Sequence, residues 1–454
     1  MSLSIVILAA GKGTRMKSKK PKVMHTLAGR PLLQHVIDTA KKLNPAELVV
    51  VCGNGADVVV PHVEQQGFKT VMQHEQKGTG HAVEQAKDFF KNSDQILVLY
   101  GDVPLTQHST LEALINEGDK DSLKVLTTEL NDPTGYGRIV RDAEGNMLRI
   151  IEQKDADEAT KLINEVNSGI MCIPSKWLND AIAKLDNNNA QGEYYLTDLI
   201  AQASEQGMPI DSVICDDEME VAGVNNRLQL AELESHYQQG KATELMLSGV
   251  TLVDPARIDI RGDLTTGQDI HVDINVIFEG TNTIADNVEI GANCTIINSS
   301  IAEGSIILAN SIIENSEVGA NCTIGPFARL RPDTKLAAKA KIGNFVETKN
   351  ANIGLGSKVN HLSYIGDTDM GADVNIGAGT ITCNYDGANK HRTTIGDRVF
   401  VGSDTQLVAP VTLEDGATIG AGSTIRKDAP ADALTLTMSK VKSVEGWKRP
   451  VKKK

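Results

Sequence analysis

The first residues that could do chemistry lie near the start of the chain, in the stretch LAAGKGTRM at residues 8–16. It follows an apolar run at residues 5–7 and combines two glycines with Lys12 and Arg15, and Lys22 comes shortly afterwards. Glycines let backbone N–H groups approach a phosphate closely, and basic side chains neutralise its charge. The stretch therefore predicts a site for a nucleotide phosphate, although a glycine turn between a strand and a helix would explain it equally well.

Two further segments carry side chains suited to a nucleotide. QKGTGHA at residues 76–82 is a second glycine-rich loop that opens a helical segment, and Gln73 precedes it. YGDVPL at residues 100–105 ends an apolar run with Asp102, where an α/β enzyme presents a metal ligand, but Asp102 alone could equally cap a turn. The P-loop pattern GxxxxGK[ST] is absent, and the first loop departs from the dinucleotide pattern GxGxxG because Met16 stands at its last glycine position. This excludes an ordinary P-loop NTPase and a simple NAD enzyme.

The second half of the chain offers a different kind of chemistry, centred on His361 in KVNHLSYIGD at residues 358–367. A histidine near its ordinary pKa is suited to remove a proton from an amine at neutral pH. Arg331 and Lys349 precede it, and two cations that converge on one groove suit a sugar phosphate. A surface histidine and a solvated basic face are the alternatives.

The elements that must position these residues differ between the two halves. Up to about residue 225, short apolar strands at residues 4–10, 47–53 and 95–102 alternate with amphipathic helices. This pattern predicts a doubly wound, Rossmann-like α/β domain with its ligand crevice at the carboxyl ends of the strands. One helix is predicted from five apolar residues at helical spacing: Leu32, Leu33, Val36, Ile37 and Ala40.

Residues 226–248 read as a connecting helix, and residues 249–454 read as a second domain with a C-terminal tail. In this domain an aliphatic residue returns at every sixth position, with a slip between Ile296 and Ile306. A sustained period of six predicts a β-solenoid. An insertion, CNYDGANKHR at residues 383–392, interrupts the period and predicts a projecting loop. The positions expected to point inward include Val272, Phe278, Ile284, Ile290, Ile296, Ile306, Ile312, Val318, Ile324, Leu330, Leu336, Ile342, Ile395, Val401, Leu407, Leu413, Ile419 and Ile425.

Composition sets the remaining limits. The 454 residues are 41% hydrophobic, which predicts a globular chain of two or more domains. The net charge of -14 argues against nucleic acid and anionic membranes as partners, and no apolar run approaches the roughly 20 residues that span a bilayer. Six scattered cysteines without a CxxC pair suggest neither a zinc site nor a disulfide framework. We expect a cytoplasmic protein.

Taken together, the motifs resemble known families. The ordered set LAAGKGTRM, PKVMHTLAGRPLL, QKGTGHA, YGDVPL, PTGYGRI, IEQKDA, EVNSG, GEYYLTD and VAGVNNR is similar to that of the sugar-1-phosphate nucleotidyltransferases. The period-six half resembles the left-handed parallel β-helix of the hexapeptide-repeat acyltransferases. The whole chain, to EGWKRP near its end, resembles the bacterial bifunctional N-acetylglucosamine-1-phosphate uridyltransferases/glucosamine-1-phosphate N-acetyltransferases.

For the first domain, this resemblance implies uridylyl transfer from UTP to N-acetylglucosamine-1-phosphate with release of pyrophosphate. Asp102 and Asn225 would hold Mg²⁺, and Arg15 and Lys22 would be catalytic residues that bind phosphates. The residues implied to bind UTP or the UDP-sugar product are Leu8, Ala9, Ala10, Gly11, Lys22, Gln73, Gly78, Thr79, Tyr100, Gly101, Asp102, Gly137, Glu152, Asn167 and Asn225.

For the solenoid, the resemblance implies N-acetylation of glucosamine-1-phosphate by acetyl-CoA, with His361 as general base. It also implies a homotrimer whose acyl sites lie between neighbouring solenoids, and a product used for peptidoglycan and lipopolysaccharide. Where the family carries an arginine for CoA, this chain offers Lys440. The sugar phosphate would contact Arg331, Lys349, Tyr364 and Asn375, and acetyl-CoA would contact Ala378, Asn384, Tyr385, Ser403, Ala421 and Lys440.

Two other interpretations stay open at this point. The chain could be a nucleotidyltransferase with a single activity, whose solenoid only oligomerises or regulates. The solenoid could also be a passive scaffold or a zinc site. Its candidate ligands would then be His271, His361 and His391, although a catalytic zinc needs three histidines that converge.

Overall fold

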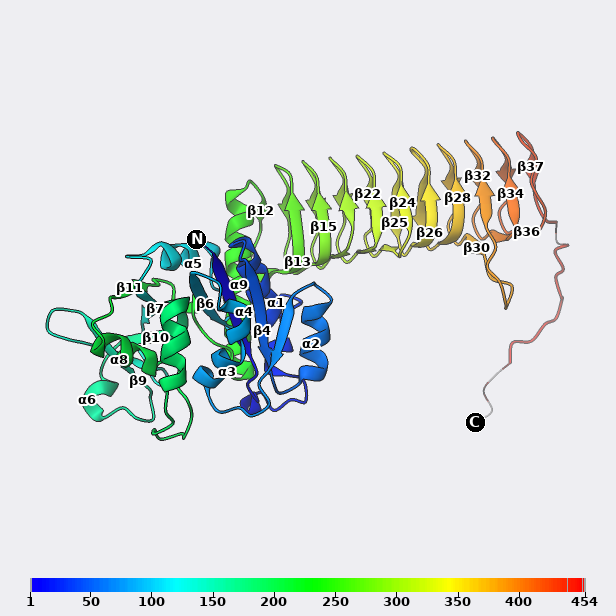
Figure 1. Cartoon of the computed structure of the whole chain (residues 1–454). Helices are drawn as coiled ribbons and strands as arrows, with labels where there is room; N and C mark the ends of the chain where they lie inside the picture. Colours follow the sequence, from blue (N-terminus) through cyan, green and yellow to red (C-terminus); the bar gives the residue numbers. More distant parts are fainter. Residues whose placement is uncertain (1, 439, 451, 453–454) are drawn as a thin grey trace. The chain divides into compact units, whose positions relative to one another are not determined.

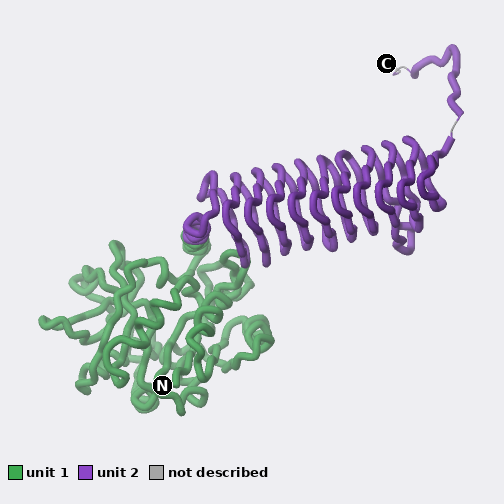
Figure 2. Tube along the Cα trace, turned by 90° about the horizontal axis from the view of Figure 1, so that it is seen from above, with its two compact units in different colours: residues 1–237 green, residues 238–454 purple. Residues whose placement is uncertain are grey.

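The computed structural model describes residues 2–438, 440–450 and 452, and it divides the chain into two compact units. Unit 1 is Met1–Tyr237 and unit 2 is Gln238–Lys454 (Figure 2). The boundary between them falls inside one long helix, α9 (Arg227–Leu247). The helix predicted from residue 226 onward therefore exists, and it belongs in part to each unit.

Unit 1 is built on one sheet of nine strands with helices on both faces (Figure 1). Strands β6, β1, β4 and β5 are parallel neighbours, whereas β10 runs antiparallel to β6 and β7, so the sheet is mixed. The strands are β1 (Leu3–Ala9), β4 (Glu47–Cys52), β5 (Lys69–Met72), β6 (Gln95–Tyr100), β7 (Leu123–Glu129), β8 (Arg138–Arg141), β9 (Met147–Ile151), β10 (Glu165–Pro174) and β11 (Ile210–Ile214). A separate hairpin pairs β2 (Thr26–Leu27) with β3 (Arg30–Pro31).

Alternate residues of β1 show why this sheet needs two helical layers. Val6 and Leu8 belong to the hydrophobic cluster on one face, and Ile5 and Ile7 belong to the cluster on the other. A strand that is apolar on both faces must be covered on both, and this confirms the α/β prediction. The α-helices of unit 1 before α9 are α1 (Leu32–Lys42), α2 (Ala56–Glu64), α3 (Thr79–Gln85), α4 (Lys87–Phe90), α5 (His108–Asn116), α6 (Glu158–Lys161), α7 (Ser175–Ala181) and α8 (Asp198–Glu205). The five apolar residues predicted for α1 are all buried.

Unit 2 is the predicted solenoid, a parallel β-helix of short strands in successive coils (Figure 1). One face is a sheet of eleven strands: β12 (Thr251–Leu252), β14 (His271–Val272), β16 (Glu289–Ile290), β19 (Ile306–Ile307), β22 (Thr323–Ile324), β25 (Lys341–Asn344), β27 (Lys358–His361), β29 (Asn375–Ile376), β32 (Phe400–Val401), β35 (Thr418–Ile419) and β37 (Leu434–Thr435).

The rest of each coil belongs to a second sheet of fifteen strands. Three long strands, β15, β26 and β28, each pair with two short strands of a neighbouring coil, one before and one after a corner of that coil, so the sheet bends around the corner. Its strands are β13 (Ile258–Thr266), β15 (Val276–Ile284), β17 (Thr295–Ile297), β18 (Ser300–Ile301), β20 (Ile312–Glu314), β21 (Ser316–Val318), β23 (Arg329–Leu330), β24 (Thr334–Leu336), β26 (Glu347–Ile353), β28 (Tyr364–Met370), β30 (Ile381–Cys383), β31 (Thr393–Ile395), β33 (Gln406–Val408), β34 (Val411–Leu413) and β36 (Thr424–Ile425). The insertion at residues 383–392 projects between β30 and β31, as predicted (Figure 1).

In two coils the residues that point inward differ from those that the period of six predicts. Ile306 and Ile312 were expected to point inward, but they are 36% and 38% exposed. The buried residues of these coils are Ile301, Ile307 and Ile313. Ile296 and Ile301 are five residues apart, so the period shortens by one there. Because successive side chains of a strand point to opposite faces, that one-residue slip reverses which isoleucine of each pair is inside.

Candidate functional sites

The first candidate site lies where β1 and β6 end side by side. Leu8 pairs with Tyr100 in the parallel ladder, and the N–H of Gly101 donates to the carbonyl of Leu8 at 2.9 Å. Each strand is followed at once by a segment of the predicted site, the glycine loop after β1 and Asp102 after β6. The carboxyl ends of adjacent parallel strands thus bring two motifs about 90 residues apart in sequence to one edge of the sheet.

Four polar side chains meet at this edge. Lys22 forms an ion pair with Asp102 through Nζ and Oδ2, and its Nζ lies 3.3 Å from Oδ1 of Asn225. Arg15 donates to the same Asn225 oxygen through Nη2 at 2.7 Å. The backbone supports the arrangement, because the N–H of Val224 donates to the carbonyl of Asp102 at 2.9 Å. All four residues were predicted from the sequence, and the structure brings them together.

The oxygen atoms at this edge suit a hard cation that takes its remaining ligands from water and from a substrate. Asp102 offers a carboxylate and Asn225 an amide oxygen, and Mg²⁺ typically takes one or two such ligands and completes its shell with water and substrate phosphates. The side chain of Asp102 is only 15% exposed, so the carboxylate is held largely away from bulk water. These two residues fit a magnesium ion that enters with a phosphate ligand.

The second glycine loop is held against a neighbouring segment by its backbone. The N–H of Gly80 donates to the carbonyl of Tyr194 at 2.9 Å, and the N–H of Tyr194 donates to the carbonyl of Lys77 at 2.8 Å. Gly78 has φ of 113°, and a Cβ there would overlap the Tyr194 backbone at 2.5 Å, so the turn requires glycine. Gln73 donates through Nε2 to the carbonyl of Gly78 at 3.0 Å. Gln73 and Gly78 are thereby one connected unit.

Thr79 links this loop to two other segments of the sheet edge. Its hydroxyl accepts from the N–H of Leu196 at 3.0 Å. It also hydrogen-bonds the phenol of Tyr100, whose pKa is raised mainly by burial. Tyr100 therefore stays neutral and can act as a hydrogen-bond donor in this setting.

The predicted sugar residues lie at the hairpin of β8 and β9 and on β10. The N–H of Asn167 donates to the carbonyl of Gly137 at 2.9 Å, and a Cβ on Gly137 would lie 3.4 Å from Oε1 of Glu152. Thr197 donates to Oε1 of Glu152 at 3.0 Å, and burial raises the pKa of this carboxyl. Glu152 is thus a partly desolvated hydrogen-bonding group rather than a solvated carboxylate at a strand end.

One residue beside this group was missed by the sequence reasoning, although it stands in the quoted motif PTGYGRI. The side chain of Arg138 is fully buried. It donates to the carbonyl of Tyr136 and, through Nη2, to Oε1 of Gln153 at 2.8 Å. The N–H of Gly135 donates to the same Gln153 oxygen at 3.1 Å. Arg138 and Gln153 therefore fix the loop that carries Gly137 to the segment that carries Glu152.

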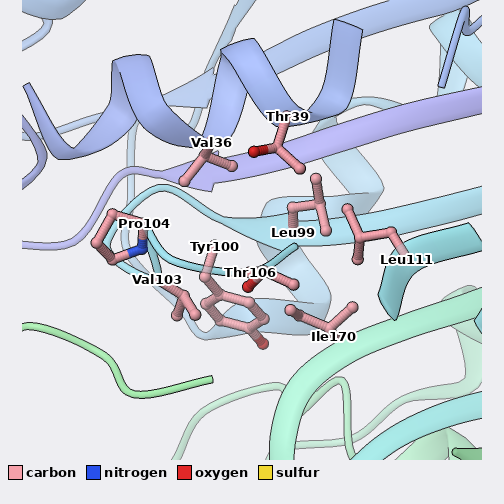
Figure 3. A pocket seen from close by; sticks show the side chains of 9 residues that line it. All are labelled: Val36, Thr39, Leu99, Tyr100, Val103, Pro104, Thr106, Leu111 and Ile170. Atoms are coloured by element: carbon pink, nitrogen blue, oxygen red, sulfur yellow. The ribbon is translucent and has the colours of Figure 1, made fainter. Parts of the chain in front are cut away.

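A small pocket beside the end of β6 is a separate feature (Figure 3). Tyr100 points into it beside Ile170 and Val103, and no charged side chain lines it. Of the predicted site residues only Tyr100 contributes to the lining. A pocket without cations is unsuited to a triphosphate, so this is not the predicted nucleotide site.

The second candidate site is on the solenoid, at the corner that follows the eleven-stranded sheet. His361 ends β27, and its Nδ1 lies 2.9 Å from Oδ1 of Asn344 on the preceding coil. An amide oxygen can only accept, so this contact selects the tautomer of the neutral imidazole in which Nδ1 carries the proton and Nε2 keeps its lone pair. A histidine with a free Nε2 lone pair at an exposed corner can accept a proton. Asn344 is a second residue that the sequence reasoning missed, because nothing in its segment marks it.

The predicted sugar-phosphate residues lie on the adjoining face, with one exception. Arg331 and Lys349 occupy equivalent positions in adjacent coils, since their preceding residues pair as Leu330 with Thr348. Tyr364 is on the next coil of the same face, whereas Asn375 is on β29 of the other sheet. The structure thus brings three of the four together.

Three cations lie close together at this face, and one of them was not predicted. The pKa of Lys349 is lowered, mainly by the ammonium group of Lys390 and then by Arg331. Lys390 belongs to the projecting loop at residues 383–392, which returns to this face. Arg331 is balanced by Glu347, with Nη1 and Oε1 2.7 Å apart. Cations that repel one another are typical of a site that receives an anion.

The residues predicted to bind acetyl-CoA fall into three groups. Ala378, Ser403 and Ala421 form a column along the same corner as His361, held by ladder bonds such as Asp404 N–H to the Ala378 carbonyl at 2.7 Å. Asn384 and Tyr385 instead begin the projecting loop, where the Asn384 side chain donates to Asp367 and the Tyr385 ring is 61% exposed. Lys440 lies beyond the last strand, β37, and is exposed. One chain therefore assembles part of this set.

Two kinds of feature are absent from the described part of the chain. Within it, no three His, Cys, Asp or Glu side chains are grouped so as to hold a metal. No helix of the described residues has the length and apolar character that a bilayer crossing needs.

Comparison with known proteins agrees with this two-part architecture. The MobA-like NTP transferase domain matches residues 5–187, the GMPPB C-terminal domain matches residues 260–355, and the bacterial transferase hexapeptide repeats match residues 392–427. The bifunctional protein GlmU of Ralstonia nicotianae is 56% identical over 100% of this chain and 99% of its own length. The GlmU proteins of Cupriavidus pinatubonensis and Ralstonia pickettii are 54% and 55% identical over 99% and 100% of this chain and 99% of their own lengths. The chain belongs to the bifunctional GlmU family.

Proposed function

We propose that the two candidate sites catalyse successive steps in the synthesis of UDP-N-acetylglucosamine. The chain is a bifunctional enzyme, a uridyltransferase and an acetyltransferase. The solenoid site acetylates glucosamine-1-phosphate with acetyl-CoA, and the site of unit 1 then joins the product to the uridylyl group of UTP. The order follows from the chemistry, because the acetylated sugar phosphate is the acceptor of the second reaction.

In uridylyl transfer, a phosphate oxygen of N-acetylglucosamine-1-phosphate bonds to the α-phosphorus of UTP, and the bond to pyrophosphate breaks. The residues at the edge of β1 and β6 must bring two anions together and offset their repulsion. Lys22 and Arg15 supply positive charge, and the backbone N–H groups of the first glycine loop orient the nucleotide. Mg²⁺ held by Asp102 and Asn225 would neutralise charge on the reacting phosphates.

The sugar half of this reaction is assigned to the group around Gly137. Glu152 and Asn167 present hydrogen-bonding atoms near the Gly137 backbone, and a ligand rich in hydroxyls can pair with each of them. Buried polar atoms without partners are costly, so this group favours a sugar over an apolar substrate. Gln73, Gly78 and Thr79 are assigned to the uridine, whose base offers both donors and acceptors.

In acetyl transfer, the amine of glucosamine-1-phosphate attacks the thioester carbonyl of acetyl-CoA. Nε2 of His361 accepts a proton from the attacking amine as the new C–N bond forms. The C–S bond of the thioester then breaks, and the imidazolium returns the proton to sulfur, so that CoA leaves as its thiol. Asn344 holds the imidazole so that Nε2 is the basic atom. Arg331, Lys349 and Lys390 offer a positive pocket for the sugar phosphate, next to the phenol of Tyr364.

The observation that carries the assignment is the meeting of Lys22, Arg15, Asp102 and Asn225 at one strand edge, with His361 on a separate solenoid. Incubation of the full chain with glucosamine-1-phosphate, acetyl-CoA, UTP and Mg²⁺ should yield UDP-N-acetylglucosamine, free CoA and pyrophosphate, measured by mass spectrometry. Omission of acetyl-CoA should stop all three products. Formation of a UDP-sugar without any acetylated sugar would contradict the acetyl step and favour the single-activity alternative.

We assign a homotrimer to the chain, with the acyl site shared between solenoids. Hexapeptide repeats indicate oligomerisation, and within one chain Asn384 and Tyr385 begin the projecting loop after β30 rather than lying on the corner of His361. A further support is a pair of stacked rings beside the active corner. Phe327 and Phe345 are 50% and 55% exposed, with centroids 5.4 Å apart and φ of 57° and 56°. Bulky residues are strained in this backbone region, by about 1 kcal/mol or more each.

Replacing both rings, as Phe327→Asp with Phe345→Asp, should therefore weaken the oligomer, because charged side chains would have to be desolvated at the interface. We expect light scattering to show a fall from the mass of three chains toward that of one at micromolar protein concentration. Asn310→Asp is the matched control, since Asn310 is the corner residue of the preceding coil with φ of 62°. If the double variant kept the mass of three chains, the two rings would not be part of the interface.

The cellular setting follows from the proposed product and from the thiols. UDP-N-acetylglucosamine is a precursor of peptidoglycan and lipopolysaccharide, and UTP and acetyl-CoA are cytoplasmic substrates. All six cysteines, each within the described part of the chain, are free thiols. Reduced cysteines fit a cytoplasmic enzyme.

A further inference from the structure

The ammonium group of Lys22 contacts the two side-chain oxygens that are assigned to the metal. Its ammonium group forms an ion pair with Oδ2 of Asp102 and lies 3.3 Å from Oδ1 of Asn225. Arg15 donates to the same Asn225 oxygen at 2.7 Å. Both proposed ligands are therefore engaged by side-chain N–H groups of the chain itself.

An ammonium group and Mg²⁺ cannot both occupy the space between the Asp102 and Asn225 oxygens. Mg²⁺ needs its ligand oxygens at about 2.0–2.1 Å and in near-octahedral directions. The side chains of Lys22 and Asp102 are only 16% and 15% exposed, so little solvent would screen the repulsion between the two cations. Asp102 would then face a divalent ion and an ammonium group at once, while Arg15 still donates to the Asn225 oxygen. A bound metal therefore requires that the Lys22 ammonium leave.

The backbone around Lys22 allows the end of the side chain to move while its base stays fixed. Gly13 has φ of 57°, and a Cβ there would lie 2.7 Å from Cβ of Lys22, so the first glycine loop packs directly on this residue. The N–H groups of Met24 and His25 close the short turn by donating to Pro21 and Lys22 carbonyls at 3.0 and 3.1 Å. The chain is held at Cα and Cβ, and the four-carbon stem of the lysine supplies the motion.

We propose that Lys22 is a placeholder for the metal: it occupies the metal position in the nucleotide-free enzyme and exchanges onto a nucleotide phosphate when the metal–nucleotide complex binds. The inference rests on the proposed uridylyl transfer. It has a consequence for the order of binding, because the free enzyme disfavours the metal alone. The triphosphate removes this penalty by giving the displaced ammonium a new anionic partner.

The first test measures binding of Mn²⁺ alone to the full chain without nucleotide, by electron paramagnetic resonance of the free ion. Mn²⁺ prefers the same oxygen ligands as Mg²⁺. Lys22→Met should bind Mn²⁺ about tenfold more tightly than the wild type, since the metal no longer displaces a charged hydrogen bond. Lys19→Met removes an exposed charge three residues away and should leave the affinity unchanged. Equal or weaker binding by Lys22→Met would overturn the placeholder.

The Asp102→Asn variant distinguishes a failure of the placeholder proposal from a failure of the proposed uridylyl transfer. If Asp102→Asn binds Mn²⁺ as tightly as the wild type, the assignment of the metal to Asp102 is wrong, and the uridylyl proposal loses its metal site. If Asp102→Asn binds weakly while Lys22→Met equals the wild type, only the placeholder is wrong. Circular dichroism of each variant shows whether the fold is intact.

A second measurement uses the wild type and so does not depend on any variant. Reductive methylation of lysines, read by mass spectrometry, reports how available each ammonium group is. Saturating Mn²⁺ without nucleotide should raise the rate at Lys22 several-fold and leave the rate at Lys19 unchanged, and UTP added with Mn²⁺ should lower the Lys22 rate again. An unchanged Lys22 rate under saturating Mn²⁺ would show that the metal binds without displacing it.

Discussion

Asp102→Ala should abolish uridylyl transfer and leave acetyl transfer intact. The variant removes the only carboxylate proposed to hold Mg²⁺, and it leaves Lys22 without the partner that now positions it. Loss of charge stabilisation in the transition state makes us expect a fall in kcat of about a thousandfold or more. Pyrophosphate release from UTP and N-acetylglucosamine-1-phosphate measures the first activity. CoA thiol release from acetyl-CoA and glucosamine-1-phosphate measures the second.

The same strand provides a matched control for this prediction. Asp94 lies just before the other end of β6, where its carboxylate accepts from the N–H of Ser2 at 2.7 Å. Asp94→Ala removes a carboxylate of the same type, so its pyrophosphate release should stay near that of the wild type. An Asp102→Ala enzyme that released pyrophosphate at a rate comparable to the Asp94→Ala enzyme would show that the metal assignment is wrong.

His361→Ala should produce the opposite pattern. Without Nε2 to accept the amine proton, acetyl transfer should fall by about 10²–10⁴-fold at neutral pH. Uridylyl transfer should continue when N-acetylglucosamine-1-phosphate is supplied directly, because the variant changes only an exposed corner of the solenoid. Thiol release and pyrophosphate release are measured on the same preparation.

His271 serves as the control for the histidine. It is an exposed residue on β14 of the same solenoid, and it has no part in the proposed site. His271→Ala should therefore keep both activities. Acetyl transfer by His361→Ala at the rate of the His271→Ala enzyme would remove His361 from its proposed role as base, and the proton would need another acceptor on the same face.

Much of the architecture could be predicted because local periodicity reports which side of an element is buried. The apolar residues of α1 recur at helical spacing and are buried, and the apolar run of β1 fits a strand covered on both faces. The limit of this reasoning appears at Ile306 and Ile307, where two equal side chains are adjacent. Periodicity alone does not decide which of them is inside after a one-residue slip, and the packed coils put Ile307 inward.

The sequence by itself determined the elements, the family and the types of residue that could do each reaction. Only the tertiary structure decided which of these residues meet. Lys22, Asp102 and Asn225 are dispersed over 200 residues, and they converge because adjacent parallel strands end at one edge and the chain returns to it before α9. Asn344 and Lys390 reach the second site because coiling stacks residues of successive turns and returns the loop to this face. Such contacts depend on distances across the fold, and the local pattern of a sequence holds no record of them.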